Sequence, residues 1–195
     1  MPDQFLYQQS IVNVDYSSQS LEKMEYEDCI FKNCDFSNCS LNGSRFIDTK
    51  FVDCNLSNAR ILEVSFQDVT FSNCKMLGLH FDQSKPFGFS VLFNNCQLNH
   101  SVFYQVNVGQ SAFNDCQLQG VDFTEANLKG VSLKNSDLLN AIFDNTNLEK
   151  ADLSHSINYS INPEVNKIKG AKFSLPEVIG LLDKYDIQIE WSIHL

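Results

Sequence analysis

The 195-residue chain has few of the residues that usually make turns, with eight glycines and four prolines. No apolar run approaches the roughly 18 residues that a membrane-spanning helix needs. The start, MPDQFLYQQS, has no basic stretch and no apolar core, which disfavours a secretory leader. Positive charge is also scarce, because 14 Lys and Arg stand against 24 Asp and Glu, for a net charge of −10 at pH 7. We therefore expect a soluble cytoplasmic protein that binds neither nucleic acid nor an anionic membrane directly.

The hydrophobic residues, 43% of the chain, are distributed with a period of five. In DCIFKNCDFSNCSLNGSRF, the residues Cys29, Cys34 and Cys39 lie five apart, and each precedes a large apolar residue by two positions. This period fits neither an α-helix, at 3.6 residues, nor a single strand, at two. The large residue recurs every five positions over 16–81 and again over 93–153. Such short repeats predict a solenoid, in which each unit buries its apolar residues only against its neighbours.

Segments such as Ala126-Asn127-Leu128 have a small, polar, large order, and with it the chain resembles the pentapeptide repeat family over residues 11–158. The resemblance implies an all-β solenoid, a right-handed quadrilateral parallel β-helix with one repeat on each side and four repeats in each coil. About seven coils at the roughly 4.8 Å spacing of stacked strands form a rod on the order of 35 Å long. Residues 1–10 are expected to cap one end of this rod, and residues 159–195 the other.

Four repeats per coil predict that residues 20 apart stack on one side. From Phe81 to Phe93 is two repeats plus two extra residues, which indicates a two-residue insertion at about 82–92. We interpret the cysteines as small, reduced core residues, with metal ligation as the alternative that their parallel stacking disfavours. With the insertion counted, five cysteines and five phenylalanines form two columns: Cys34, Cys54, Cys74, Cys96 and Cys116, and Phe31, Phe51, Phe71, Phe93 and Phe113.

The insertion falls within Lys85-Pro86-Phe87-Gly88-Phe89. Counting five residues forward from Phe81 puts Pro86 at the core position, and counting five back from Phe93 puts Gly88 there. We therefore expect Phe87 or Phe89 to fill the gap. A Phe that protrudes to contact a partner is the alternative.

Asn and Asp replace glycine at the corners of the predicted coil. These side chains bond to nearby backbone and tolerate positive φ angles. The second place after the large residue holds Asp28, Asn33, Asn38, Gly43, Asp48, Asp53, Asn58, Asp68 and Asn73.

Three of these corner residues, Asp28, Asp48 and Asp68, are 20 apart and are expected to stack about 5 Å from one another, with Glu25 and Glu27 nearby. Like charges at that spacing repel, so the column costs stability unless a partner neutralises it. It indicates a protein partner with a basic groove built for DNA. The alternative is that the aspartates only make turns on a solubilising face.

The C-terminal segment leaves the five-residue register. Ser174-Leu175-Pro176-Glu177 has the pattern of a capping box and predicts an α-helix at about 175–184, with a short strand at 187–189 after it. The apolar surface is wider than one coil end needs, which predicts a homodimer joined through the C-terminal ends. The alternative is that the helix only plugs its own coil. The residues of this surface are Leu175, Val178, Ile179, Leu181, Leu182, Tyr185 and Trp191.

The tail FSLPEVIGLLDKYDIQI is similar in order and character to the tails of the quinolone-resistance members of the family, the Qnr and MfpA proteins. This resemblance implies dimeric rods that imitate DNA and bind DNA gyrase or topoisomerase IV. The long loops that matter for quinolone protection in some Qnr proteins are missing here, which leaves protection or inhibition open. A general interaction scaffold with another partner is the alternative function.

No enzyme motif is present. The four histidines, His80, His100, His155 and His194, are scattered, and neither GxSxG, HExxH nor a phosphate-binding glycine loop occurs. A rod without a cleft does not bring two carboxylates together around a substrate. We therefore expect no catalytic residue, no metal site and no cofactor.

Overall fold

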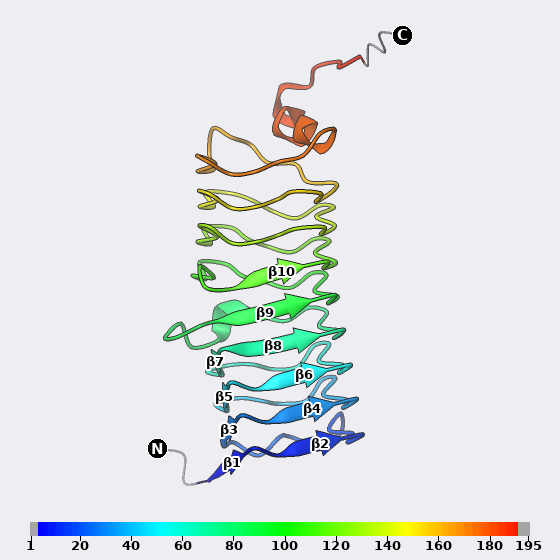
Figure 1. The fold of residues 1–195 in the computed structure, drawn as a ribbon, viewed down its shortest axis with the longest axis vertical. Coiled ribbons are helices and arrows are strands. Elements are labelled where there is room, and N and C mark those ends of the chain that lie inside the picture. The colour runs from blue at the N-terminus through cyan, green and yellow to red at the C-terminus, as the bar shows by residue number, and fades with distance from the viewer. Residues whose placement is uncertain (1–3, 191–195) are drawn as a thin grey trace.

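The computed structural model describes residues 4–190 and shows a rod in which the chain winds repeatedly around one axis (Figure 1). All strand pairs in this part of the chain are parallel, so the prediction of an all-β parallel solenoid is confirmed. A four-stranded sheet contains β1 (Phe5–Tyr7), β3 (Glu25–Glu27), β5 (Arg45–Ile47) and β7 (Ser65–Gln67). A six-stranded sheet contains β2 (Ser10–Val12), β4 (Ile30–Lys32), β6 (Lys50–Val52), β8 (Val69–Ser72), β9 (Val91–Asn94) and β10 (Ala112–Asn114).

Each coil has four sides, because residues one coil apart pair at four places per circuit. Side 1 is the four-stranded sheet, continued beyond the insertion by bridges that run from Asn107 to Lys167. Side 2 is the six-stranded sheet, continued by bridges as far as Lys172. Sides 3 and 4 consist of isolated bridges that begin with the pairs Asp15–Asp35 and Ser20–Ser40. The right-handed sense of the coil remains a prediction.

The two-residue insertion lies on side 1, and its predicted position is confirmed by the strand register. Thr70 pairs with Leu92, an offset of 22, whereas Lys50 pairs with Thr70 at the regular offset of 20. The N–H of Lys85 still donates to the carbonyl of Val64 at 2.8 Å, as in a regular coil. The extra residues therefore follow Lys85 and precede β9, after a short 3₁₀ helix, η1 (Phe81–Gln83), and the chain there protrudes from the wall in Figure 1.

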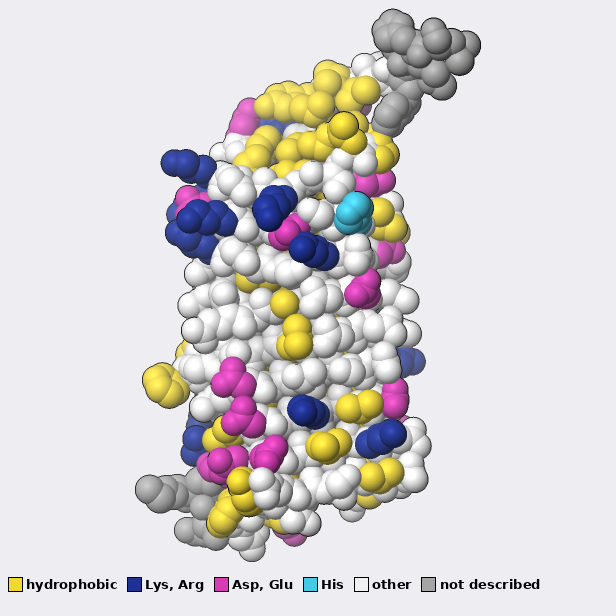
Figure 2. All heavy atoms as spheres, in the orientation of Figure 1, with side chains coloured by type: hydrophobic (Ala, Val, Ile, Leu, Met, Phe, Trp, Pro, Cys, Tyr) yellow, Lys and Arg dark blue, Asp and Glu magenta, His cyan; other side chains and the backbone are white. Residues whose placement is uncertain are grey.

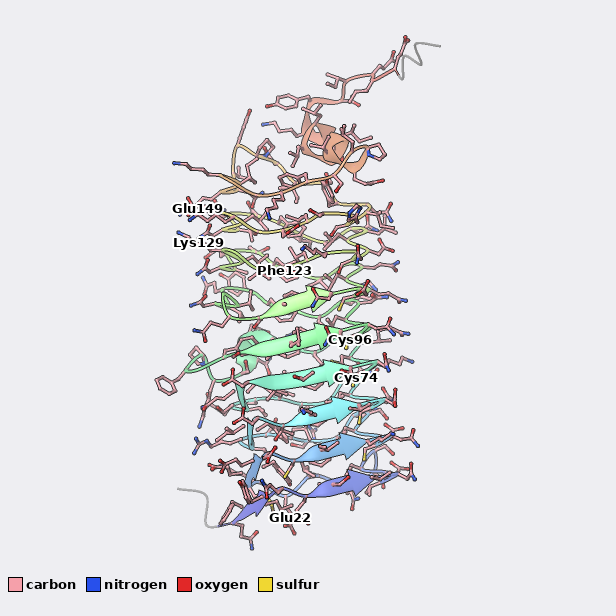
Figure 3. All side chains as sticks on the ribbon, viewed as in Figure 1. Glu22, Cys74, Cys96, Phe123, Lys129 and Glu149 are labelled. Atoms are coloured by element: carbon pink, nitrogen blue, oxygen red, sulfur yellow. The ribbon has the colours of Figure 1, made fainter. Side chains whose placement is uncertain are left out.

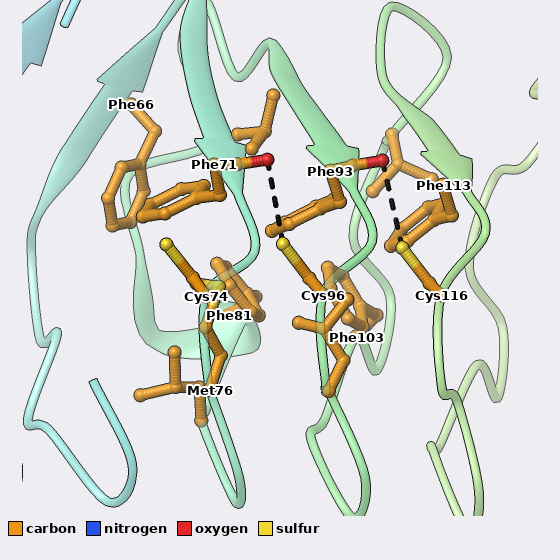
Figure 4. Packing of buried hydrophobic residues seen from close by; sticks show 14 of the residues in the cluster. Phe66, Phe71, Cys74, Met76, Phe81, Phe93, Cys96, Phe103, Phe113 and Cys116 are labelled. Atoms are coloured by element: carbon orange, nitrogen blue, oxygen red, sulfur yellow. Dashed lines mark hydrogen bonds between the residues drawn. The ribbon is translucent and has the colours of Figure 1, made fainter. Parts of the chain in front are cut away.

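The core consists of columns of identical side chains, as the 20-residue stacking predicts (Figure 4). The rings of Phe71 and Phe93 stack with their centroids 5.5 Å apart, and those of Phe93 and Phe113 at 5.0 Å. The thiols of Cys96 and Cys116 donate to the carbonyls of Phe71 and Phe93, at 3.5 and 3.6 Å. Each thiol therefore has a partner without leaving the core, and this column and the phenylalanine column are both confirmed.

The corners of the coil have the left-handed backbone that the sequence predicts. All nine predicted corner residues have φ between 49° and 72°. The corner amides also bond along the rod, since Asn73 donates to Asp53 at 3.0 Å and Asn95 donates to Asn73 at 2.9 Å. Asn and Asp therefore supply both the turn conformation and a bond between coils, which glycine cannot do.

The segment 175–184 is not an α-helix, so the predicted capping helix is wrong. Two short 3₁₀ helices, η2 (Glu177–Leu181) and η3 (Asp183–Tyr185), stand there. Ser174 Oγ accepts the N–H of His155 at 3.1 Å, and the Glu177 carboxylate accepts the N–H of Asn158 at 3.3 Å. The predicted capping box does not form, because both side chains satisfy donors of the last coil instead.

A backbone contact explains why this segment does not continue as an α-helix. The carbonyl of Gly180 accepts the N–H of Ile161 at 3.0 Å, in place of a donor four residues further along its own chain. The predicted strand at 187–189 is also wrong, since these residues pair with no strand in the described part of the chain. As far as residue 190, the C-terminal segment is therefore a docked cap with two short 3₁₀ helices and neither an α-helix nor a strand.

Candidate partner-binding surface

Asp28, Asp48 and Asp68 lie at the corner between sides 1 and 2, directly after β3, β5 and β7 respectively. All three are exposed, with φ of 52°, 49° and 52°. The pairing of β3 with β5 and of β5 with β7 places them one above the other in successive coils. The sequence thus predicted the position of this acidic column correctly.

The column has polar neighbours but no counter-ion. Gln8 Nε2 donates to the Asp28 carboxylate at 2.9 Å, and Ser90 Oγ donates to that of Asp68 at 2.8 Å. Glu25 forms an ion pair with Arg45 at 2.7 Å, and Glu27 lies half-buried on β3. Within residues 4–190, none of the three aspartates has a cation within 4 Å. The charge of the column is therefore left for solvent or a partner to neutralise.

The C-terminal end of the rod differs in charge from the rest of it. Residues 4–125 have 14 acidic and seven basic side chains, whereas residues 126–173 have five acidic and six basic ones. Figure 2 shows Asp and Glu gathered near the N-terminal end of the rod, and Lys and Arg near its C-terminal end. Lys129 and Glu149 lie one above the other on successive coils, paired at 3.0 Å (Figure 3). A simple copy of DNA would need an evenly acidic rod, and this surface is not evenly acidic.

Asp152 is the best-neutralised acid of the C-terminal half. Lys134 and Lys172 lie 3.2 and 3.6 Å from its carboxylate, whose side chain is 16% exposed. Burial acts to raise the pKa of Asp152, but the hydrogen bonds from Ser154 and the Lys134 ammonium outweigh it and hold the pKa at about 2. The ionised form is therefore favoured in the folded state.

Low pH is expected to reduce the free energy of unfolding by protonating Asp152. Because the pKa of Asp152 is lower when folded than when unfolded, its contribution is present above about pH 4 and is lost as the pH falls towards 2. Asp152→Asn is expected to lose about 1–2 kcal/mol of unfolding free energy at pH 7 and little at pH 2.5. Urea unfolding at both pH values measures this, with the exposed Asp144→Asn as control. If Asp152→Asn lost the same unfolding free energy at pH 7 and at pH 2.5, the lowered pKa of Asp152 would not be a source of stability.

The irregular loop uses its two phenylalanines differently. Phe89 is 5% exposed and lies 6.3 Å from Phe66 and 6.2 Å from Phe81, centroid to centroid, so it fills the gap left by Pro86 and Gly88. Phe87 is 84% exposed and protrudes. Of the two expected fillers Phe89 is the one observed, and the alternative of a protruding Phe applies to Phe87.

The C-terminal end presents an exposed apolar surface, visible in Figure 2. Leu181 packs against the core, and Val178 is half-buried. Trp191, also predicted to belong to this surface, lies outside the described residues. The exposed members of the predicted set are Leu175 (83%), Ile179 (41%), Leu182 (39%) and Tyr185 (47%).

The seven cysteines are free and buried, as expected of core residues. Burial raises the pKa of the Cys116 thiol to about 12. Within residues 4–190, no group of three or more His, Cys, Asp or Glu side chains is arranged to hold a metal ion. In the same part of the chain, no helix has the length and apolar character to cross a membrane.

The model of the family described as "Pentapeptide repeat region" matches residues 10–86 and 88–173. Among solved structures, the chain is similar to trypsin-treated QnrB1, a plasmid-mediated fluoroquinolone resistance protein, at 20% identity and a TM-score of 0.47 over 96% of this chain and 100% of that one. HetL from the cyanobacterium Nostoc, involved in heterocyst differentiation regulation, has 15% identity and a TM-score of 0.45 over 86% and 84%. No curated protein matches the chain.

Proposed function

Because the chain belongs to the pentapeptide repeat family, we propose that it is a non-enzymatic cytoplasmic binding protein whose acidic column engages the DNA-binding groove of a type II topoisomerase, DNA gyrase or topoisomerase IV. The observation that carries this proposal is the column of Asp28, Asp48 and Asp68, which is exposed and, among residues 4–190, has no cation within 4 Å. A groove lined with Lys and Arg supplies the missing counter-charges and recovers the cost of stacking three carboxylates.

The rigidity of the column supports imitation of a DNA strand. Successive coils are roughly 4.8 Å apart, a wider interval than the about 3.4 Å of helix axis between phosphates along one strand of duplex DNA. A solenoid holds its charges at fixed intervals because each coil is bonded to the next along four sides. The column is therefore a rigid row of negative charge that needs no folding on binding.

The second part of the proposal is a homodimer joined through the C-terminal ends. The exposed apolar surface around Leu175 and Tyr185 supports it, because water favours covering such a patch. A two-fold axis through this end would place two acidic columns at opposite ends of a rod of about 70 Å.

The alternative function is an interaction scaffold for another partner, and the charge distribution favours it. Lys129, Lys150 and Lys169 lie in the C-terminal half of the rod, where a DNA-binding groove would repel them. A partner with acidic and basic regions in sequence fits the whole rod better than a uniformly basic groove does. The two functions differ in their effect on topoisomerases.

The test replaces the column by its neutral isosteres. Because Asn keeps the left-handed corner, the triple variant Asp28→Asn, Asp48→Asn, Asp68→Asn is expected to fold normally. We expect the concentration needed to alter gyrase supercoiling or topoisomerase IV decatenation to rise about tenfold, from roughly 0.5 kcal/mol for each of three charges. Assays with and without a quinolone separate inhibition from protection.

The matched control removes the same number of charges elsewhere, as Glu22→Gln, Glu63→Gln and Glu125→Gln. This variant is expected to act like the unchanged protein within about twofold, because its carboxylates lie outside the column. A wild-type protein without effect on either enzyme at micromolar concentration refutes the topoisomerase proposal and leaves the scaffold.

A further inference from the structure

A hollow of about 520 Å³ lies on side 1, between the outer faces of β5 and β7 and the irregular loop. Its volume falls within the range of roughly 300–1,000 Å³ that small-molecule sites occupy. The charged side chains of its lining are all basic, although the chain as a whole has a net charge of −10. The lining residues used below are Lys23, Arg45, Ser65, Gln67, Lys85 and Phe87.

Two of the three cations are not neutralised. Arg45 is paired with Glu25 at 2.7 Å, but among residues 4–190 neither Lys23 nor Lys85 has a carboxylate within 4 Å. The hollow therefore has a local positive surplus within an otherwise acidic half of the rod. An anion that enters it gains attraction without displacing an existing partner.

A glycine makes room for Lys23 beside the hollow. A side chain at Gly43 would have its Cβ 2.7 Å from Cε of Lys23, so any other residue at this corner would displace the lysine stem. Lys85, half-buried, is fixed on the other side through its backbone bond to Val64 at 2.8 Å. Between them, Gln67 Nε2 donates to Ser65 Oγ at 3.1 Å, which provides a polar floor.

Phe87 also lines the hollow, and core packing does not explain why this ring lies on the surface. Because Phe89 fills the core, Phe87 is free to protrude beside the hollow, 84% exposed. An exposed ring costs free energy in water and offers a face for stacking. The two-residue insertion therefore adds an aromatic surface next to the basic group.

We propose that this hollow binds a small aromatic anion, with its ring against Phe87 and its phosphate or carboxylate group between Lys23 and Lys85. Arg45 contributes through the side of its guanidinium that faces away from Glu25. Size restricts the ligand, because Glu25, which is paired with Arg45, and the acidic column, which directly follows β5 and β7, repel a polyanion such as nucleic acid. A compact ligand stays within reach of the lysines and clear of these carboxylates.

Titration of the full chain with phenyl phosphate, adenosine monophosphate and inorganic phosphate, followed by calorimetry and amide NMR, tests the proposal. We expect phenyl phosphate to bind saturably at one site per chain, shifting the amides of Gly43 and Gln67, and inorganic phosphate to bind at least about tenfold more weakly. Saturable binding of adenosine monophosphate would support the proposal and show that the site also accepts a phosphate carried by a larger aromatic ring system. No saturable binding of phenyl phosphate up to about 10 mM overturns the proposal.

Variants then separate the two parts of the site. Lys23→Gln and Lys85→Gln are each expected to weaken phenyl phosphate about tenfold. Phe87→Ala is expected to weaken phenyl phosphate by a similar factor and leave inorganic phosphate unchanged. Lys50→Gln and Tyr104→Ala, an exposed lysine and an exposed aromatic outside the hollow, are the controls. Equal losses in the controls, or phosphate binding as tight as that of phenyl phosphate, refute the site.

Discussion

Phe93→Ala is expected to lower the free energy of unfolding by about 3–5 kcal/mol. Phe93 is 0% exposed and lies between Phe71 and Phe113, with which its ring is nearly parallel, at interplanar angles of 11° and 16°. Its edges meet Phe81 and Phe103 at 5.6 and 6.3 Å. Removal of the ring leaves a cavity that neighbouring coils, bonded along four sides, cannot close.

Urea unfolding followed by circular dichroism measures this loss, and Phe87→Ala is the matched control. Because Phe87 is 84% exposed, its removal is expected to change stability by no more than about 0.5 kcal/mol. A loss below about 1 kcal/mol for Phe93→Ala would show that the coils relax around the cavity. The stacked column would then not be the main source of stability in the middle of the rod.

Gly180→Ala is expected to detach the C-terminal segment from the last coil. A Cβ at this position would lie 2.0 Å from the carbonyl oxygen of Tyr159, a backbone atom that cannot move aside without disturbing the coil. The bond from the N–H of Ile161 to the Gly180 carbonyl breaks as the segment moves away. Overpacking of this kind costs about 1–3 kcal/mol, and here the docked segment can escape it by opening.

Limited proteolysis and sedimentation measure the two consequences. Cleavage within 175–190 is expected to accelerate at least about tenfold, since it follows the open population. If the protein is a dimer joined at this end, Gly180→Ala also becomes a monomer. Gly109→Ala, whose added Cβ comes no closer than 3.3 Å to any atom, is the control. Unchanged cleavage would contradict the docking, and a wild-type monomer would contradict the dimer.

The repeat pattern alone does not show that Lys23, Lys85 and Phe87 line one hollow. The sequence singled out Lys85 and Phe87 only as members of an irregular loop and Gly43 only as a corner of the coil, and Lys23 was not singled out at all. These residues come from different coils, and they meet because Lys23 lies over Gly43, one coil further on. The signal available beforehand was the 20-residue spacing between Lys23 and Gly43, combined with the absence of a side chain at the second position.

The acidic column was predictable because it follows the same register as the core. Once four repeats make one coil, Asp28, Asp48 and Asp68 must stack, whatever their side chains do. Their hydrogen bonds were not predictable, since Gln8 and Ser90 reach them from neighbouring coils at distances that only side-chain placement decides.

The sequence by itself determined the solenoid, its coil length, the insertion and the left-handed corners. The five-residue repeat occurs many times on both sides of the insertion, and only one register buries every large residue. Only the tertiary structure decided the C-terminal cap. Ser174 and Glu177 could satisfy either their own helix start or the open N–H groups of His155 and Asn158. The last coil has no successor to accept those donors, so the cap bonds to the coil and the helix does not form.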